Sequence, residues 1–214
     1  MIHSSDSIDP LSLRLAVLLL AAGEGSRMGS RPKALLKRGD QTLLERCIEA
    51  VQPFSPVEFV LLTGFHAELI ENYLIDLKPG LNCPIRVVRN VAPERGQASS
   101  VRLGLESLKS DFDVLLIFLS DQPEITDQEI AQLMRSYIAK SVGKEIVLPM
   151  VSGQRGNPVL LSRQAIANIL ETPGLACRPY MDAHPEKICS METDNRAFVV
   201  DVDTVDDIQK QQLE

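Results

Sequence analysis

Glycines and basic side chains crowd the segment that follows the first apolar run of the chain. Gly23, Gly25 and Gly29 come where that run ends. Five cations fall within twelve residues, at Arg27, Arg31, Lys33, Lys37 and Arg38. Glycine lets main-chain amides come close to phosphate oxygens because no Cβ intervenes. The spacing fits neither the Walker A motif nor the G-x-G-x-x-G fingerprint. The segment still favours a polyphosphate-binding loop over a tight turn beside a solvated basic stretch.

Carboxylates at two distant places could hold a divalent cation. Asp121 follows an apolar run and is itself followed by Pro123, whereas Asp201 and Asp203 lie two residues apart near the C-terminus. On a strand, residues two apart share one face. Mg²⁺ prefers oxygen ligands and usually takes one or two carboxylates together with substrate phosphates. A turn or cap residue is the alternative interpretation of Asp121.

The size and charge of the chain limit its function classes. It has 214 residues, 44% apolar and 24% charged, with a net charge of −7. These values are typical of a globular protein and exclude fibrous repeats and wholesale disorder. An acidic chain is a poor candidate for binding nucleic acid through its whole surface, so we expect no nucleic-acid partner.

Cysteines, histidines and the N-terminus indicate a cytoplasmic protein without a membrane partner. No two of the four cysteines form a C-x-x-C pair, and the three histidines are scattered. Reduced thiols that act as small hydrophobes are therefore expected. Asp6 and Asp9 stand where a signal peptide needs basic residues. The run Leu15–Ala22 is much shorter than the roughly 20 residues that cross a bilayer.

Continuous apolar runs alternate with segments that have helical spacing. The predicted strands cover 14–20, 57–63, 85–90, 113–120 and 145–150, then shorter ones at 158–161 and 197–200. The predicted helices cover 42–52, 66–77, 97–109, 126–140, 162–170 and 204–212, with capping residues at Thr126 and Thr204. This alternation predicts one α/β domain over 14–214, after a disordered lead over 1–13. Its core would be a Rossmann-like, mostly parallel sheet flanked by helices.

Several motifs together carry a family resemblance over roughly residues 14–210. The segment L-A-A-G-x-G-x-R-M-G followed by P-K resembles the signature of nucleotidyltransferases that activate sugars and cofactors with an NTP. Within them the chain resembles the MobA-like NTP transferases, and most closely the molybdenum cofactor cytidylyltransferase branch. Further matching segments are PERGQASSVRLGL (93–105), SDQP (120–123), RGNPVLL (155–161) and VVDVDTVDDI (199–208).

The resemblance implies a fold like that of nucleotide-diphospho-sugar transferases and a set of site residues. Arg27, Lys33 and Asp121 would be catalytic, and Mg²⁺ would be held by Asp121 and Asp203. The acceptor would meet Gly156, Asn157 and Pro158, although many relatives carry His in place of Asn157. The nucleotide would contact Leu20, Ala21, Ala22, Gly23, Gly25, Ser26, Arg27, Lys33, Gly96, Ser99 and Asp121. From the residues alone, Ser99 and Ser100 are ordinary caps of a helix start.

The resemblance further implies that an NMP moves from an NTP to a phosphorylated acceptor and that pyrophosphate leaves. The L-A-A-G form resembles the cytidylyl branch, so CTP is the expected nucleotide and molybdenum-bearing molybdopterin the expected acceptor. An apo-molybdoenzyme or its chaperone would then receive the product. Two alternatives stay open: a related transferase that uses GTP, another NTP or another small phosphorylated acceptor, and a non-catalytic chaperone that binds the molybdenum cofactor.

Overall fold

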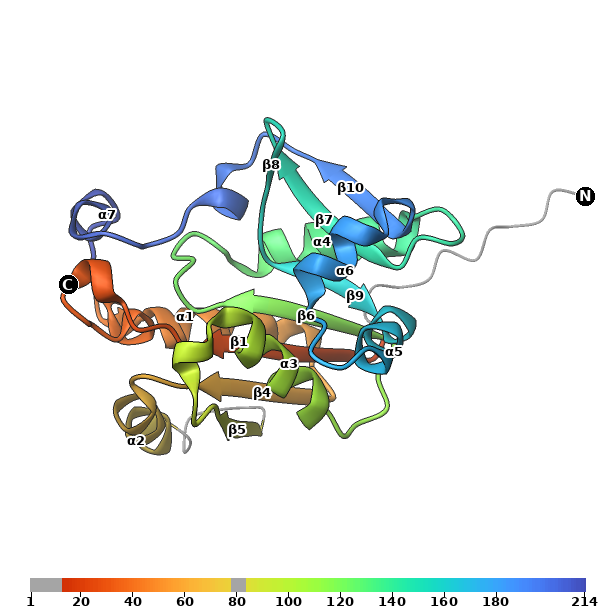
Figure 1. Ribbon diagram of the computed structural model, residues 1–214. Helices are drawn as coiled ribbons and strands as arrows, with labels where there is room; N and C mark the ends of the chain where they lie inside the picture. The colour runs from red at the N-terminus through yellow and green to blue at the C-terminus, as the bar shows by residue number, and fades with distance from the viewer. Residues whose placement is uncertain (1–12, 78–83) are drawn as a thin grey trace, which may run out of the picture.

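The structure is a computed structural model that describes residues 13–77 and 84–214. The lead predicted to be disordered therefore lies outside the described residues, except for its last position. An eight-stranded sheet forms the centre, in the order β10-β7-β9-β6-β1-β4-β5, and β8 pairs with β7 at one end (Figure 1). Its strands are β1 (Leu15–Ala21), β4 (Glu58–Thr63), β5 (Ile85–Arg89), β6 (Val114–Leu119), β7 (Ile146–Val151), β8 (Gln154–Arg155), β9 (Val159–Ser162) and β10 (Ile188–Glu192). The short strands β2 (Lys37–Arg38) and β3 (Gln41–Thr42) form a separate antiparallel pair.

The sheet is mostly parallel, as the alternating pattern predicts. β1 runs parallel to both β4 and β6, and the β4–β5 and β7–β10 pairs are also parallel. β9 is antiparallel to β6 and β7. Every residue of β1 is buried because helices cover both faces of the sheet, which explains its continuous apolar sequence.

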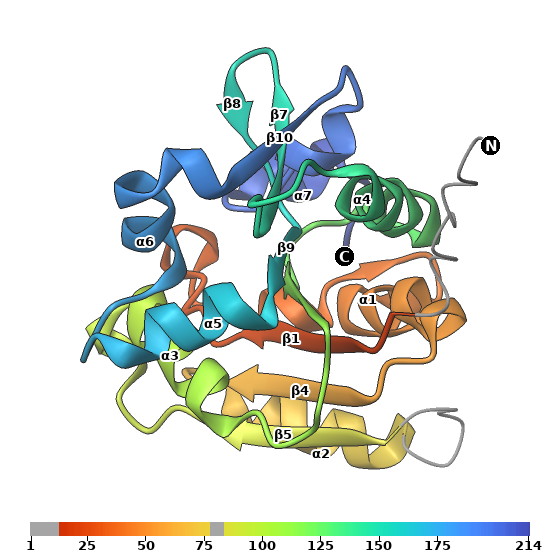
Figure 2. The same cartoon turned by 90° about the vertical axis from the view of Figure 1, so that its right-hand side faces the viewer.

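Alternate residues of β1 pack into two separate hydrophobic cores. Val17 and Leu19 point to one core with α1 (Leu43–Val51), α2 (Ala67–Leu77) and α4 (Asp127–Ala139). Leu18 and Leu20 point to the other core with α3 (Gln97–Ser107), α5 (Arg163–Glu171) and α6 (Cys177–Ala183). Figure 2 shows these two groups of helices on opposite sides of the sheet. The fold is thus the Rossmann-like α/β sandwich that the sequence predicts.

The predicted helix starts are confirmed by their caps. Thr126 and Glu129 form a capping box at α4, and Thr204 caps α7 (Val205–Lys210) together with Asp207. A third box joins Thr42 and Glu45 at α1. Each box satisfies amide donors that a helix start leaves without a partner.

The prediction of a strand at 197–200 is wrong. Residues Arg196–Val199 form a 3₁₀ turn that Asn195 caps, and the turn buries Ala197 and Phe198 in the core. An apolar stretch of four residues can be buried by a tight turn as well as by a strand, so its composition alone does not distinguish them. The edge strand is β10 instead, and α6 lies between α5 and β10 where no helix was predicted.

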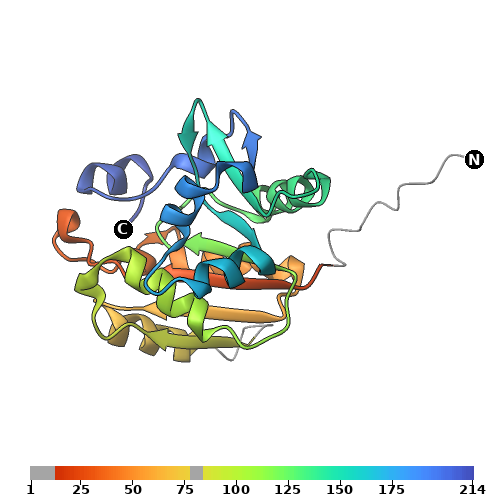
Figure 3. The same cartoon turned by 45° about the vertical axis from the view of Figure 1, so that its right-hand side comes forward.

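A small third core joins the C-terminal segment to the loop that follows β1. Met28 and Leu36 from the loop pack with Val202, Ile208 and Leu213. The backbones of Lys37 and Glu214 exchange two hydrogen bonds. Figure 3 shows α7 beside this loop. The two segments that carry Lys33 and Asp203 are therefore held together by packing.

Two observations concern the cellular setting expected from the sequence. Cys47 and Cys177 are buried and free, and Cys189 is free and half-buried. Burial raises the pKa of the Cys177 thiol to about 12, which suits a thiol that only packs. Among the described residues, none of the helices combines the length and apolar character needed to cross a bilayer.

Candidate active site

A cleft of about 420 Å³ opens where β1 and β6 end. The chain leaves β1 toward β4 on one side and returns to β6 on the other, so these two strands flank a topological switch point. Ligands of open α/β sheets bind at such points, outside the carboxyl ends of the strands. The predicted nucleotide or metal residues that line the cleft are Leu20, Ala21, Ala22, Gly23, Arg27, Lys33, Gly96, Asp121 and Asp203.

One end of the cleft is a network of four charged side chains. Lys33 Nζ donates to Asp121 Oδ2 at 2.9 Å and to Asp203 Oδ1 at 2.5 Å. Arg27 Nη2 donates to Asp203 Oδ2 at 2.6 Å. Lys33 is only 15% exposed, whereas Arg27 is 66% exposed. The four residues carry no net charge together, and they combine cations for phosphates with carboxylates for a metal.

Local structure explains how these side chains converge. Asp121 is the second residue after β6, and Lys33 begins a 3₁₀ turn after Pro32. Asp203 stands in the irregular segment before α7, so it does not share a strand face with Asp201 as the sequence suggested. Val202 N donates to Asp121 O at 3.0 Å and so ties the two carboxylate-bearing segments together.

The proximity of opposite charges changes the proton affinity of the network. Partial burial opposes the charged form of Lys33, but the neighbouring Asp121 and Asp203 outweigh it and raise the Lys33 pKa. Partial burial likewise opposes the charged form of Asp203, but its bonds and attraction to Lys33 and Arg27 lower the Asp203 pKa. Lys33 and Asp203 are therefore both ionised across the neutral range.

The carboxylates suit a magnesium ion. Asp121 Oδ1 is buried and has no hydrogen-bond partner among the described residues, so it has a lone pair to offer. Asp203 lies at the same end of the cleft, and Lys33 donates a hydrogen bond to each of the two carboxylates. Within residues 13–77 and 84–214, no group of three or more acidic, histidine or cysteine side chains is arranged to hold a metal. The remaining ligands would then be phosphate and water oxygens, which is the usual way for proteins to bind Mg²⁺.

Two predicted residues of the glycine-rich loop shape it without lining the cleft. Gly25 has φ +66°, and a Cβ there would overlap the Arg31 carbonyl. Ser26 begins a 3₁₀ turn that ends at Met28. Gly25 is therefore required by the backbone path, and the nucleotide contacts predicted for Gly25 and Ser26 stay predictions.

The start of α3 brings Ser100 rather than Ser99 to the cleft. Gly96, Gln97 and Ser100 line the cleft. Ser99 Oγ donates to Gly96 O at 2.8 Å from within the helix, and the N-cap is Gly96 with no side-chain cap, so the serine cap expected from residue type is wrong. A helix that begins at Gln97 places Gln97 and Ser100 on one face, since residues three apart are neighbours on a helix.

The predicted acceptor residues lie on the connection between β8 and β9 and do not line the cleft. Gly156 packs so closely that a Cβ would come within 2.6 Å of Phe198 O. Gln122 Nε2 donates to Asn157 O at 2.9 Å, which links this loop to the residue after Asp121. The acceptor role of Gly156, Asn157 and Pro158 stays a prediction.

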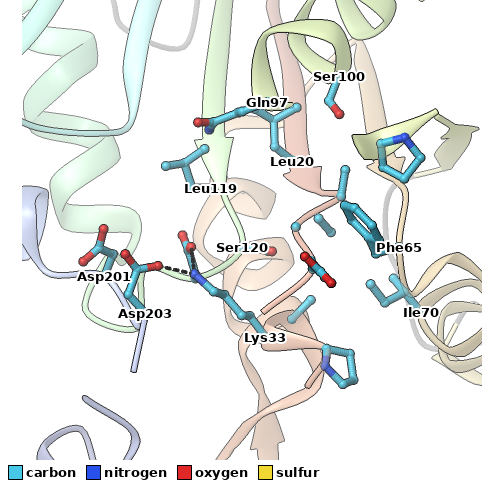
Figure 4. A pocket seen from close by; sticks show the side chains of 18 of the residues that line it. Leu20, Lys33, Phe65, Ile70, Gln97, Ser100, Leu119, Ser120, Asp201 and Asp203 are labelled. Atoms are coloured by element: carbon cyan, nitrogen blue, oxygen red, sulfur yellow. Dashed lines mark hydrogen bonds and ion pairs between the residues drawn. The ribbon is translucent and has the colours of Figure 1, made fainter. Parts of the chain in front are cut away.

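The other end of the cleft combines the predicted residue Leu20 with residues to which the sequence assigned no role. In Figure 4, Gln97, Leu20 and Leu119 lie together at one end, and Lys33 and Asp203 lie at the other. Phe65 is the second residue after β4, is 42% exposed and lines the cleft. An aromatic residue just past the carboxyl end of a predicted parallel strand was the signal that could have identified it. Further lining residues are Glu24, Pro32, Ala34, Ile70, Pro93, Ser100, Ser120 and Asp201.

The family follows from a comparison with known protein domains. The model of the MobA-like NTP transferase domain matches residues 17–186. The chain belongs to this family. The match includes most of β1, the glycine-rich loop and Asp121, and it ends before Asp203.

Curated relatives match part of this chain. Bifunctional protein GlmU of Mycobacterium avium is 30% identical over 151 residues, which is 70% of this chain and 31% of GlmU. The chain thus spans about a third of the length of the curated relatives that it matches.

Solved structures share the fold at low identity. Rv0371c of Mycobacterium tuberculosis superposes with a TM-score of 0.72 at 22% identity, over 92% of this chain and 97% of that one. A second structure of Rv0371c is a complex with manganese and has a TM-score of 0.67 at 21% identity, over 93% of this chain and 97% of that one. The 4-diphosphocytidyl-2C-methyl-D-erythritol synthase of Anaerococcus prevotii has a TM-score of 0.72 at 14% identity, over 97% of both chains.

Proposed function

We propose that this protein is a nucleotidyltransferase that moves an NMP from an NTP to a phosphorylated acceptor and releases pyrophosphate. CTP is the favoured nucleotide, and molybdenum-bearing molybdopterin is the favoured acceptor. The observation that carries the proposal is the convergence of Lys33, Asp121, Asp203 and Arg27 at one end of a cleft in a MobA-like domain.

The charged end of the cleft suits the triphosphate. An acceptor phosphate oxygen attacks the α-phosphorus, and the bond from that phosphorus to the pyrophosphate oxygen breaks. No protein nucleophile is needed, so catalysis rests on positioning and charge neutralisation. Lys33 and Arg27 neutralise the negative charge that accumulates on the α-phosphate and on the departing pyrophosphate.

Asp121 and Asp203 would hold Mg²⁺, which when bound supplies positive charge to the phosphate oxygens. The free lone pair of Asp121 Oδ1 supports this role. The manganese complex of Rv0371c, a protein of the same fold, is compatible with a divalent cation here. Lys33, which bonds both carboxylates, holds them side by side at the same end of the cleft.

The opposite end of the cleft suits a nucleobase. Leu20 and Leu119 offer apolar surface, and Gln97 and Ser100 offer groups that hydrogen-bond. Such a mixture binds the faces of a base and reads its edge. The preference for CTP rests on the L-A-A-G form of residues 20–23 and is supported by the shared fold of the diphosphocytidyl synthase.

The acceptor is proposed from the resemblance to the molybdenum cofactor cytidylyltransferase branch. The loop with Gly156 and Asn157 is linked through Gln122 to the segment that carries Asp121. An acceptor bound against that loop would therefore lie near the proposed metal ligands. The product would pass to an apo-molybdoenzyme or its chaperone.

A thermal-shift screen of CTP, GTP, ATP and UTP with Mg²⁺ tests the nucleotide. The proposal predicts that CTP stabilises the protein most, and equal stabilisation by all four would contradict the base preference. Mass spectrometry of the products formed from a nucleotide mixture and a crude cofactor extract tests the acceptor. A nucleotide that binds but is never transferred would indicate a carrier rather than an enzyme.

A further inference from the structure

The turn between β4 and α2 packs directly against the start of the glycine-rich loop. Gly64 lies so close to that loop that a Cβ would come within 2.8 Å of Ala22 Cβ and Ala22 O. Phe65 N donates to Ala22 O at 3.5 Å. The two segments are far apart in sequence, and only a glycine at residue 64 permits this approach.

The next residue of the turn, His66, forms a hydrogen bond with the glycine-rich loop. His66 Nε2 lies 2.8 Å from the carbonyl oxygen of Glu24. A carbonyl can only accept, so the ring donates through Nε2–H. His66 is half-buried and stands just before α2, a fixed element whose Ile70 and Leu74 are in the core. The donor is therefore anchored to the scaffold rather than to the loop that it holds.

This hydrogen bond sets the direction of a main-chain amide. In a trans peptide the carbonyl and the following N–H point in opposite directions. Because the Glu24 carbonyl points to His66, the N–H of Gly25 points away from His66. Among the described residues, none accepts a hydrogen bond from the main-chain N–H of Gly23, Glu24 or Gly25. Gly23 and Glu24 line the cleft, so this run of amides has donors to offer an anion there.

We propose that His66 is a positioning residue that holds residues 23–25 in the loop conformation whose unpartnered main-chain amides, those of Gly23 and Glu24 at the cleft, bind the triphosphate. It acts through the Glu24 carbonyl and does not touch the substrate. The inference rests on the proposed function, because it assumes that the phosphates lie against this loop. Tripolyphosphate, which carries the phosphate chain without base or ribose, isolates this contribution.

The test is displacement of a fluorescent CTP analogue, in the presence of Mg²⁺, by tripolyphosphate or by cytidine. In His66→Ala, the affinity for tripolyphosphate is expected to fall about three- to tenfold, the effect of one lost hydrogen bond. The affinity for cytidine is expected to stay unchanged. His66→Gln is expected to restore tripolyphosphate binding because its carboxamide N–H can donate to the same carbonyl. His184→Ala is the matched control, since His184 bonds Glu186 after α6.

His66→Phe separates positioning from packing, because it keeps a ring of similar size but lacks the donor. It is expected to lose tripolyphosphate affinity as His66→Ala does and to keep the melting temperature of the unmodified protein. Wild-type tripolyphosphate affinity in both variants would overturn the inference. An equal loss of cytidine and tripolyphosphate binding would also overturn it, since that indicates general collapse of the site. If the unmodified protein binds neither the CTP analogue nor tripolyphosphate, the proposed function itself fails.

Discussion

Lys33 Nζ donates a 2.9 Å hydrogen bond to Asp121 Oδ2, although 88 residues separate the two in sequence. The same ammonium reaches Asp203, which is 170 residues away from it. Three segments of the chain thus place an ammonium and two carboxylates together at the carboxyl ends of β1 and β6. A cluster of this kind suits phosphate and metal together, and the contribution of each member can be tested by substitution.

Asp121→Asn and Asp203→Asn are expected to lower the rate of nucleotidyl transfer by about 10²–10³, the cost of losing one preorganised charge at a transition state. Each variant keeps the shape of the side chain but removes a negative ligand for Mg²⁺. Rates should be measured across a Mg²⁺ titration. An Asp121→Asn protein with an unchanged rate at limiting Mg²⁺ would show that this carboxylate does not hold the metal.

Lys33→Met and Arg27→Met are expected to differ in severity. Lys33 is 15% exposed and bonds two carboxylates, so its loss should cost about 10²–10³ in rate. Arg27 is 66% exposed, where water screens its charge, so its loss should cost less than about tenfold. The rate of the unmodified protein divided by that of Arg27→Met should shrink as salt rises. A larger effect for Arg27 than for Lys33 would contradict the arrangement described here.

The pH dependence of stability follows from the ion pair between Asp203 and Lys33. The pKa of Asp203 is below its ordinary 3.8, so its ion pairs stabilise the folded state above that value. This contribution is lost as the pH falls through the lowered pKa. The pKa of Lys33 is above its ordinary 10.5, so the Lys33 contribution is complete below that value and is lost as the pH rises through the raised pKa.

Denaturant unfolding of the unmodified protein and of Asp203→Asn checks this expectation. The gap in unfolding free energy between them should be full near neutral pH and should narrow as the pH falls below 3.8. An equal difference in unfolding free energy near neutral pH and below pH 3.8 would mean that the charge of Asp203 does not stabilise the folded state.

The parts of the site that are local in sequence could be predicted well. The loop after β1 combines glycines and cations within a few residues, and six of the eight contact residues predicted over 20–33, at the end of β1 and in this loop, line the cleft. Asp121 follows a predicted strand, and its place at the carboxyl edge then follows from the parallel sheet. The choice of Asp203 over Asp201 came from the family resemblance alone, because the position of Asp203 depends on Val202 packing into the small third core.

The parts that depend on tertiary packing could not be predicted. A helix start at Gln97 decides whether Ser99 or Ser100 faces the cleft, and a shift of one residue exchanges them. Phe65 and His66 matter because Gly64 lets their turn approach Ala22, and this closeness has no local signature. The strand expected at 197–200 failed because Phe198 is buried by a turn.

Gly156→Ala tests how tightly the connection between β8 and β9 is packed. A Cβ there would lie 2.6 Å from Phe198 O and 2.9 Å from Phe198 Cβ. The variant is expected to lose about 1–3 kcal/mol of unfolding free energy, as overpacked sites do. Thermal and denaturant unfolding measure this loss. Gly153→Ala is a poor control because a side chain at its positive φ strains the backbone. Gly23→Ala is the better control for stability because nothing lies within 4 Å of the added Cβ. Unchanged stability in Gly156→Ala would show that the loop adjusts freely.

The most direct test of the central claim follows the α-phosphate and the pyrophosphate in one reaction. CTP labelled at the α-phosphate is incubated with the protein, Mg²⁺ and a molybdopterin-type acceptor. The account predicts that label appears on the acceptor in an amount equal to the pyrophosphate released, and that Asp121→Asn forms neither product at a comparable rate. Release of orthophosphate instead of pyrophosphate, or pyrophosphate without labelled acceptor, would contradict it.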